Sequence, residues 1–237
     1  MPGLSTISRL FRRSAGARGA GARGSSLFEL MGTIAIMTIV MGVLYEGIAS
    51  LSAAVEGTDS RLQNLGEARH LMAVATKDIR TATRLQSGTS PFALADKRRV
   101  TFYGNLDSNV GPVVGARKLD ISVDANAQLI EQLWTPDPGS CAPVCAYNTT
   151  QPVSRFVGRF VANPASTPIF RYFDVNGTEI TVPAGGLTDG SPTPSALAIY
   201  SVRITLSIKK ATSYQVAPTT VINQVRLPNV DYQAVSG

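Results

Sequence analysis

Histidine, cysteine and charged residues are all scarce in this chain of 237 residues. The single histidine, His70, excludes mechanisms that need two imidazoles and zinc sites that use paired histidines. Two cysteines are too few for a metal site made of cysteine alone. Charged residues make up only 16%, whereas hydrophobic residues reach 44%, and this composition excludes a disordered chain.

The positive charge of the chain is concentrated at its N-terminus. The formal net charge is +6, and residues 1–24 contain five arginines and no acid. Of the 22 lysines and arginines, removal of these five leaves 17 against 16 acidic residues. The basic character therefore belongs to the N-terminus, and we do not expect nucleic acid among the partners of this protein.

A long uncharged run follows the arginines. Residues 30–45 carry no charge, and Glu46 ends the run. With Leu27 and Phe28 the apolar stretch has about 19 residues, roughly 28 Å as a helix, which matches a bilayer core. Because the arginines precede it, the positive-inside rule predicts a single pass through the cytoplasmic membrane, with the part of the chain after residue 46 outside.

Three simpler interpretations of this segment compete. A removable secretory signal would need a shorter apolar stretch without an acid, although Ala49–Ala54 could hold a cleavage site. A twin-arginine signal is suggested by Arg12 and Arg13, but no apolar pair follows them. A plain signal anchor explains the hydropathy but not the acid Glu29.

Glu29 is the most informative residue of the segment. A carboxylate in hydrocarbon costs on the order of 3 kcal/mol, so a persistent one implies a partner. If the chain were cut after Gly24, Ser25 would carry a new α-amino group one helical turn from Glu29. In an array of subunits the amine of one chain can meet the carboxylate of its neighbour. Alternatively, Glu29 reaches the cytoplasmic surface of the membrane.

A basic leader ending in Gly24, then Ser25-Ser-Leu-Phe-Glu29 and a long apolar run, resembles the signal of type IV pilins and pseudopilins. The resemblance implies that a prepilin peptidase cuts between Gly24 and Ser25 and methylates the N-terminus of Ser25. It also implies that Glu29 guides subunit assembly. The expected partners are other pilins or pseudopilins, the prepilin peptidase, the inner-membrane assembly platform and membrane lipid.

The same resemblance extends to the end of the predicted helix. The segment Asp78-Ile-Arg80-Thr-Ala82 is similar to one in W-type minor pilins and J-type minor pseudopilins, where Asp78 and Arg80 would pair locally or receive the C-terminal strands. We therefore divide the chain into a leader (1–24), a long helix (25–84) that spans the membrane over 27–45, and a β-rich domain (85–237).

The helix continues beyond the membrane as an amphipathic pattern. Apolar residues recur at three- and four-residue steps, which predicts one apolar stripe that packs on the domain. The members of this stripe are Leu51, Val55, Thr58, Leu62, Leu65, Met72 and Ile79. The alternative is a membrane helix followed by a separate amphipathic helix.

From residue 98 onward the pattern changes to a period of two, which predicts strands. Asn176-Gly177 favours a hairpin with a type I′ turn. The predicted strands are Val100–Tyr103, Lys118–Val123, Gln128–Trp134, Ile169–Val175, Thr178–Val182, Leu197–Ile208 and Thr220–Leu227. A helix followed by strands predicts an α+β fold with an antiparallel sheet, and the pilin resemblance implies the same.

Cys141 and Cys145 lie in a proline-containing loop on the exported side, where two nearby cysteines most often form a disulfide. Free thiols are the alternative. We recognise no catalytic arrangement, metal site or cofactor motif, so we expect a structural subunit of pilus biogenesis, type II secretion or DNA uptake and not an enzyme. The competing hypothesis is a signal-anchored binding protein outside the cytoplasm.

Overall fold

The structure is a computed structural model of the chain. The chain divides into two compact units, Met1–Ser52 and Ala53–Gly237. The residues that the structure describes are 27–86, 88–105, 116–137, 139–140, 145–147, 151–188, 196–210 and 216–229.

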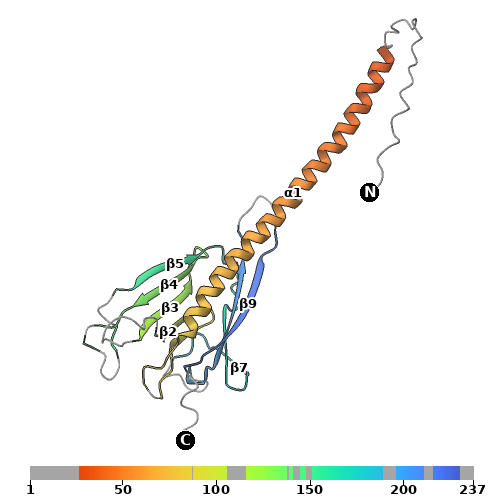
Figure 1. Cartoon of the computed structure of the whole chain (residues 1–237). Coiled ribbons are helices and arrows are strands. Elements are labelled where there is room, and N and C mark those ends of the chain that lie inside the picture. The colour runs from red at the N-terminus through yellow and green to blue at the C-terminus, as the bar shows by residue number, and fades with distance from the viewer. Residues whose placement is uncertain are drawn as a thin grey trace, which may run out of the picture. The chain divides into compact units, whose positions relative to one another are not determined.

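One long helix, α1, runs from Leu27 to Arg80 and contributes to both units (Figure 1). Its sequence contains no proline, which would interrupt the ladder of backbone hydrogen bonds. We predicted a helix to about residue 84, but α1 ends four residues earlier. It ends there because the next residues pair with the sheet: Ala82 forms a bridge with Gly104, and the N–H of Thr83 donates to the carbonyl of Tyr103.

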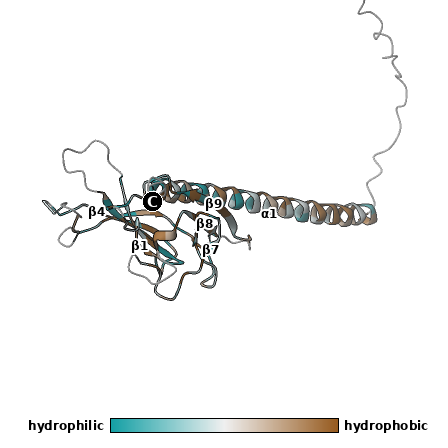
Figure 2. Cartoon of the chain, turned by 90° about the horizontal axis from the view of Figure 1, so that it is seen from below, coloured by the Kyte–Doolittle hydropathy of each residue, from teal (hydrophilic) through white to brown (hydrophobic). Residues whose placement is uncertain are grey.

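Over residues 27–52, which lie in the first unit, every side chain of α1 is exposed. Figure 2 shows that this part of the helix is predominantly hydrophobic. Among the described residues, α1 is the one helix that is long and apolar enough to cross a membrane. An apolar N-terminal helix followed by a folded β-rich domain is compatible with a single-pass membrane protein.

The apolar stripe that we predicted on α1 is confirmed only toward the end of the helix, where Met72 and Ile79 are buried in the core. Leu51, Val55 and Leu62 are exposed by 66%, 60% and 63%. The prediction was wrong over these turns, where the buried residues are instead Ser60 and Asn64, and Asn64 accepts a hydrogen bond from the N–H of Lys210. The buried residues of α1 are Ser60, Asn64, Ala68, Leu71, Met72, Ala75, Asp78 and Ile79.

The first sheet, sheet A, is an antiparallel meander whose five strands lie in chain order. Its middle strands were predicted from their period-two pattern, but its two outer strands, β1 and β5, were not. The strands are β1 (Phe92–Ala95), β2 (Arg99–Gly104), β3 (Arg117–Val123), β4 (Leu129–Trp134) and β5 (Val153–Gly158).

The second sheet, sheet B, has the strand order β7-β6-β8-β9, and its neighbouring strands are antiparallel. Its strands are β6 (Phe170–Phe173), β7 (Glu179–Ile180), β8 (Ser201–Ile208) and β9 (Thr219–Arg226). We predicted a strand from Leu197, but Ala196–Ala198 form a short 3₁₀ helix, η1. The carbonyl of Ala196 accepts hydrogen bonds from the Ser90 hydroxyl and from the N–H of Ile199, which closes a turn instead.

The hairpin between β6 and β7 confirms the predicted position of the turn but not its type. A type I′ turn needs positive φ at Asn176 and Gly177, and of these two only Gly177 has it, at φ 80°. The carboxylate of Asp174 accepts the N–H groups of Asn176 and Thr178 at 2.9 and 2.7 Å and so selects a longer turn.

Both sheets are tied to α1 by side chains of the helix. The carboxylate of Glu67 accepts the N–H of Arg159, directly after β5. The amide oxygen of Asn64 accepts the N–H of Lys210, which follows β8, and Thr76 accepts a hydrogen bond from Asn223 on β9. The core therefore lies where α1 meets the inner faces of the two sheets. One helix with two antiparallel sheets confirms the predicted α+β fold.

Candidate functional site

The predicted processing and disulfide sites fall partly outside the described residues. Gly24, Ser25 and Cys141 lie outside them, so the cleavage site, the methylation of Ser25 and the pairing of Cys141 remain predictions. Glu29 lies in the first turn of α1. Cys145 is disulfide-bonded.

Apolar side chains of α1 are also exposed at the start of the second unit. Ala54, Val55, Thr58 and Leu62 line a shallow hollow on one side of the helix, together with Asp59. Ala54, Thr58 and Leu62 are spaced four residues apart, and Val55 and Asp59 follow the first two of them, so all five lie on one face of the helix. This face presents apolar surface in a part of the chain that we place outside the membrane.

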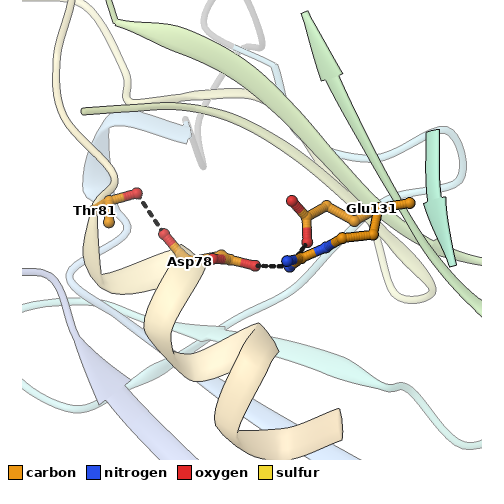
Figure 3. Close-up of polar contacts among 4 residues, drawn as sticks. Asp78, Thr81 and Glu131 are labelled. Atoms are coloured by element: carbon orange, nitrogen blue, oxygen red, sulfur yellow. Dashed lines mark hydrogen bonds and ion pairs between the residues drawn. The ribbon is translucent and has the colours of Figure 1, made fainter. Parts of the chain in front are cut away.

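The most unusual polar site lies where the C-terminal end of α1 meets sheet A. Two acidic side chains are buried next to each other here: Asp78, which is 4% exposed, and Glu131 on β4, which is 6% exposed. The guanidinium of Arg155 on β5 donates to Glu131 Oε2 at 2.5 Å and lies 3.8 Å from Asp78 Oδ2. Figure 3 shows the two carboxyl groups approaching this guanidinium from the helix and from the sheet.

The sheet register explains this arrangement. Glu131 and Arg155 are directly paired across β4 and β5, and Glu131 is also paired with the buried Ile121 on β3. Paired residues share a face of the sheet, so Glu131 and Arg155 both point to the side that packs on α1. Arg155 belongs to the last strand of sheet A and keeps a side-chain exposure of 57%, so its guanidinium joins the buried acids to solvent.

Burial and, to a smaller extent, the adjacent Glu131 raise the pKa of Asp78 from 3.8 to about 7, although Arg155 and Lys77 oppose the rise. Asp78 therefore changes its protonation state near neutral pH. When it is protonated it can donate a hydrogen bond to Glu131, and when it is ionised it needs the guanidinium.

The arrangement links the end of α1 to sheet A through two acids and one guanidinium. It contains no thiol, hydroxyl nucleophile or imidazole, and Thr81 beside it donates its hydroxyl to the Asp78 backbone carbonyl. His70 is exposed on α1. Among the described residues, no group of three histidine, cysteine, aspartate or glutamate side chains is placed to hold a metal ion.

Sequence reasoning found one of the three members of this site. Asp78 was identified with Arg80, as a local pair or as the receiver of the C-terminal strands. In the structure its ionic partner is Arg155 from β5, in the middle of the chain. Glu131 was placed on a strand without a role, and Arg155 was missed because β5 shows no clear alternation of buried and exposed residues: its first four are all exposed.

The arrangement of α1 and the two sheets is therefore the main guide to function. Comparison of the chain with protein-family models, with curated proteins and with solved structures gives no match.

Proposed function

We propose that this protein is a non-enzymatic structural subunit of a type IV filament, of the minor pilin or pseudopilin kind. One observation carries the proposal. A single helix is exposed and apolar over residues 27–52 and then, without a break, becomes the central helix of a folded β-rich domain. Such a helix can anchor the subunit in the membrane before assembly and pack with neighbouring helices afterwards.

The sequence before α1 agrees with this role. Gly24 marks the cut made by the prepilin peptidase, and Ser25 becomes the N-terminus and the site of methylation. Glu29, in the first turn of α1, then stands one turn from that terminus. In the filament the α-amino group of a neighbour pairs with Glu29, which offsets the cost of a carboxylate in an apolar environment.

The apolar face that includes Val55 and Leu62 supports the same proposal. These two side chains are exposed by 60% and 63% in the second unit. Exposed apolar residues on one helix face are typical of a surface that packs against another protein. The partners are other pilins or pseudopilins, and the assembly platform of the cytoplasmic membrane recruits the subunit from the lipid. The proposal covers pilus biogenesis, type II secretion and DNA uptake.

The experiment is to replace Glu29 by valine and to measure the ratio of filament-associated to membrane-retained protein. Removal of an acid from the apolar run leaves insertion unchanged or improved. We expect the variant to be cut normally but to enter filaments several-fold less than the wild type. Glu46→Val is the matched control, because it removes an acid from the other end of the same apolar run and should assemble normally.

Equal ratios for Glu29→Val and the wild type, with equal processing, would contradict the proposal. Residues 25–50 would then serve only as an anchor. The competing function, a signal-anchored binding protein outside the cytoplasm, would replace the filament subunit.

A further inference from the structure

Three arginines from three different strands gather on the outer face of sheet B. Tyr172, Val202 and Val225 are cross-strand partners and are buried, so their side of the sheet faces the core. The residues one position away along each strand point outward. Their outward neighbours include Arg171 on β6, Arg203 on β8 and Arg226 on β9, which we call the arginine face.

The register brings these arginines close together. Arg171 and Arg203 are directly opposite each other across β6 and β8, and Arg226 is opposite Ser201, two residues before Arg203. Neighbouring strands are about 5 Å apart, and like charges directly opposite each other are unfavourable. Glu179 on β7 lies 3.6 Å from Arg171 and offsets part of this repulsion.

Two of the guanidinium groups lie over aromatic rings. The guanidinium carbon of Arg203 is 4.4 Å from the ring centre of Phe173, and that of Arg226 is 4.6 Å from the ring centre of Tyr200. A guanidinium held over a ring loses little freedom on binding. Arg203 is further positioned by the hydrogen bond that it donates to the side-chain oxygen of Gln224 on β9, at 3.0 Å. Guanidinium groups bind phosphate oxygens, and the planar side opposite the ring can stack on a nucleobase.

A fourth cation extends the positive surface. Lys97 lines a hollow at the edge of sheet B together with Arg171, Glu179 and Thr181. Lys97 and the three arginines outnumber Glu179 among these residues, so the surface favours an anionic ligand.

We propose that the arginine face binds single-stranded nucleic acid. The outer face of a sheet offers neither a helix nor a two-stranded ribbon that could enter the groove of a duplex. It can instead bind a single strand whose bases are exposed. The arginines contact phosphates while the ring-supported guanidiniums stack on bases. An acidic protein surface would use the charge but would make no use of the stacking surfaces.

This proposal is independent of the filament role and departs from our expectation that nucleic acid is not a partner. That expectation rested on charge counted along the chain. Arg171, Arg203 and Arg226 are far apart in the sequence and form one surface only when β6, β8 and β9 pair.

The test is fluorescence anisotropy of a labelled 20-nucleotide oligo(dT) with the full-length chain in detergent micelles, titrated between 50 and 200 mM salt. We expect Arg203→Gln to weaken binding about five-fold or more at low salt. Arg171→Gln combined with Arg203→Gln should also reduce the salt slope by about 1.4, which is about 0.7 for each phosphate that is no longer neutralised. Arg203→Lys should keep the slope but lose affinity, because lysine keeps the charge and lacks the planar group.

Arg159→Gln is the matched control, because Arg159 also lies over a phenylalanine, Phe156, on sheet A at 5.1 Å. It removes the same charge and the same kind of ring contact and should leave binding unchanged. The five leader arginines are common to all these chains, so the difference between variants isolates the arginine face. Unchanged thermal unfolding of each variant shows that the fold is retained.

Three results would overturn the proposal. They are the absence of oligo(dT) binding, an equal loss in Arg159→Gln and Arg203→Gln, and tighter binding of poly-glutamate than of oligo(dT) with the same dependence on Arg203. The last would assign the surface to an acidic protein partner.

Discussion

Asp78 on α1 and Glu131 on β4 are two buried carboxyl groups that share one guanidinium, although 52 residues separate them in the sequence. The guanidinium belongs to Arg155, on the exposed last strand of sheet A. Two adjacent acidic groups hold a proton more tightly than one alone. Here the pKa of Asp78 rises to about 7 because of burial and the adjacent Glu131. The end of the long helix is therefore joined to sheet A by a contact that depends on pH.

The first prediction concerns the stability of the domain as a function of pH. The folded-state pKa of Asp78, about 7, is above its ordinary value of 3.8. The native state therefore holds this proton more tightly than the unfolded state, and the resulting stability is present below pH 4 and is lost as the pH rises through 7. Asp78→Asn should remove this loss, so its stability relative to the wild type should be greater at pH 8 than at pH 4.5, by up to a few kcal/mol.

Urea unfolding of the full chain in detergent at both pH values would measure this difference. Asp59→Asn is the control, because Asp59 is an exposed acid on the same helix. A wild type and an Asp78→Asn variant that respond to pH in parallel would show that Asp78 titrates as an ordinary aspartate.

The second prediction concerns Arg155. Arg155→Gln leaves Glu131 and ionised Asp78 without their shared cation, and we expect a loss of about 1–2 kcal/mol at pH 8, because the arginine is more than half exposed and solvent screens part of its effect. The loss should be smaller at pH 5, where Asp78 is protonated. Arg159→Gln, on the same edge of sheet A, should change stability by less than about 0.5 kcal/mol. Equal effects of the two substitutions would mean that the buried acids do not depend on Arg155.

The third prediction compares two glycines. A Cβ at Gly158, the last residue of β5, would lie 2.5 Å from Leu71 Cδ2 and would also collide with the carboxylate of Glu67. Gly158→Ala should therefore destabilise the domain by about 1–3 kcal/mol, since α1 and β5 must separate. A Cβ at Gly66 of α1 meets nothing within 4 Å, so Gly66→Ala should stabilise the helix by up to about 1 kcal/mol. Thermal unfolding of both variants checks the opposite signs, and a neutral Gly158→Ala would refute the close packing of β5 on α1.

The fourth prediction concerns processing. When the precursor is expressed with a prepilin peptidase, it should lose 24 residues and begin at Ser25. Gly24→Val should remain uncut and anchored, because the side chain fills the space at the bond that is cut. Gly21→Val, another glycine of the leader, should be cut like the wild type. N-terminal sequencing reads the result, and an intact leader in the wild type or a start near Ala53 would exclude the pilin interpretation.

The sequence by itself determined the long helix, the strands that follow it and the order of these elements, but not β1, β5 or η1. Sixteen uncharged residues from 30 to 45 and the absence of proline between Gly24 and Pro91 predicted a long helix that is apolar in its first half. Alternation along β2, β3, β4 and β8 predicted strands, because a pleated strand with one buried face has a period of two. Asp124 and Asp174 mark hairpin turns, since each carboxylate accepts the N–H groups two and four residues later.

Only the tertiary structure decided which surfaces of these elements meet. On α1 the domain buries Ser60 and Ala68 and leaves Val55 and Leu62 exposed, although all four lie on the same helix. The partnership of Asp78 with Arg155, and that of Arg171 with Arg203, depends on strand register and on contacts between distant parts of the chain. The local periodicity of the sequence does not predict such contacts, because the free energy that selects them arises only when the helix and the two sheets pack together.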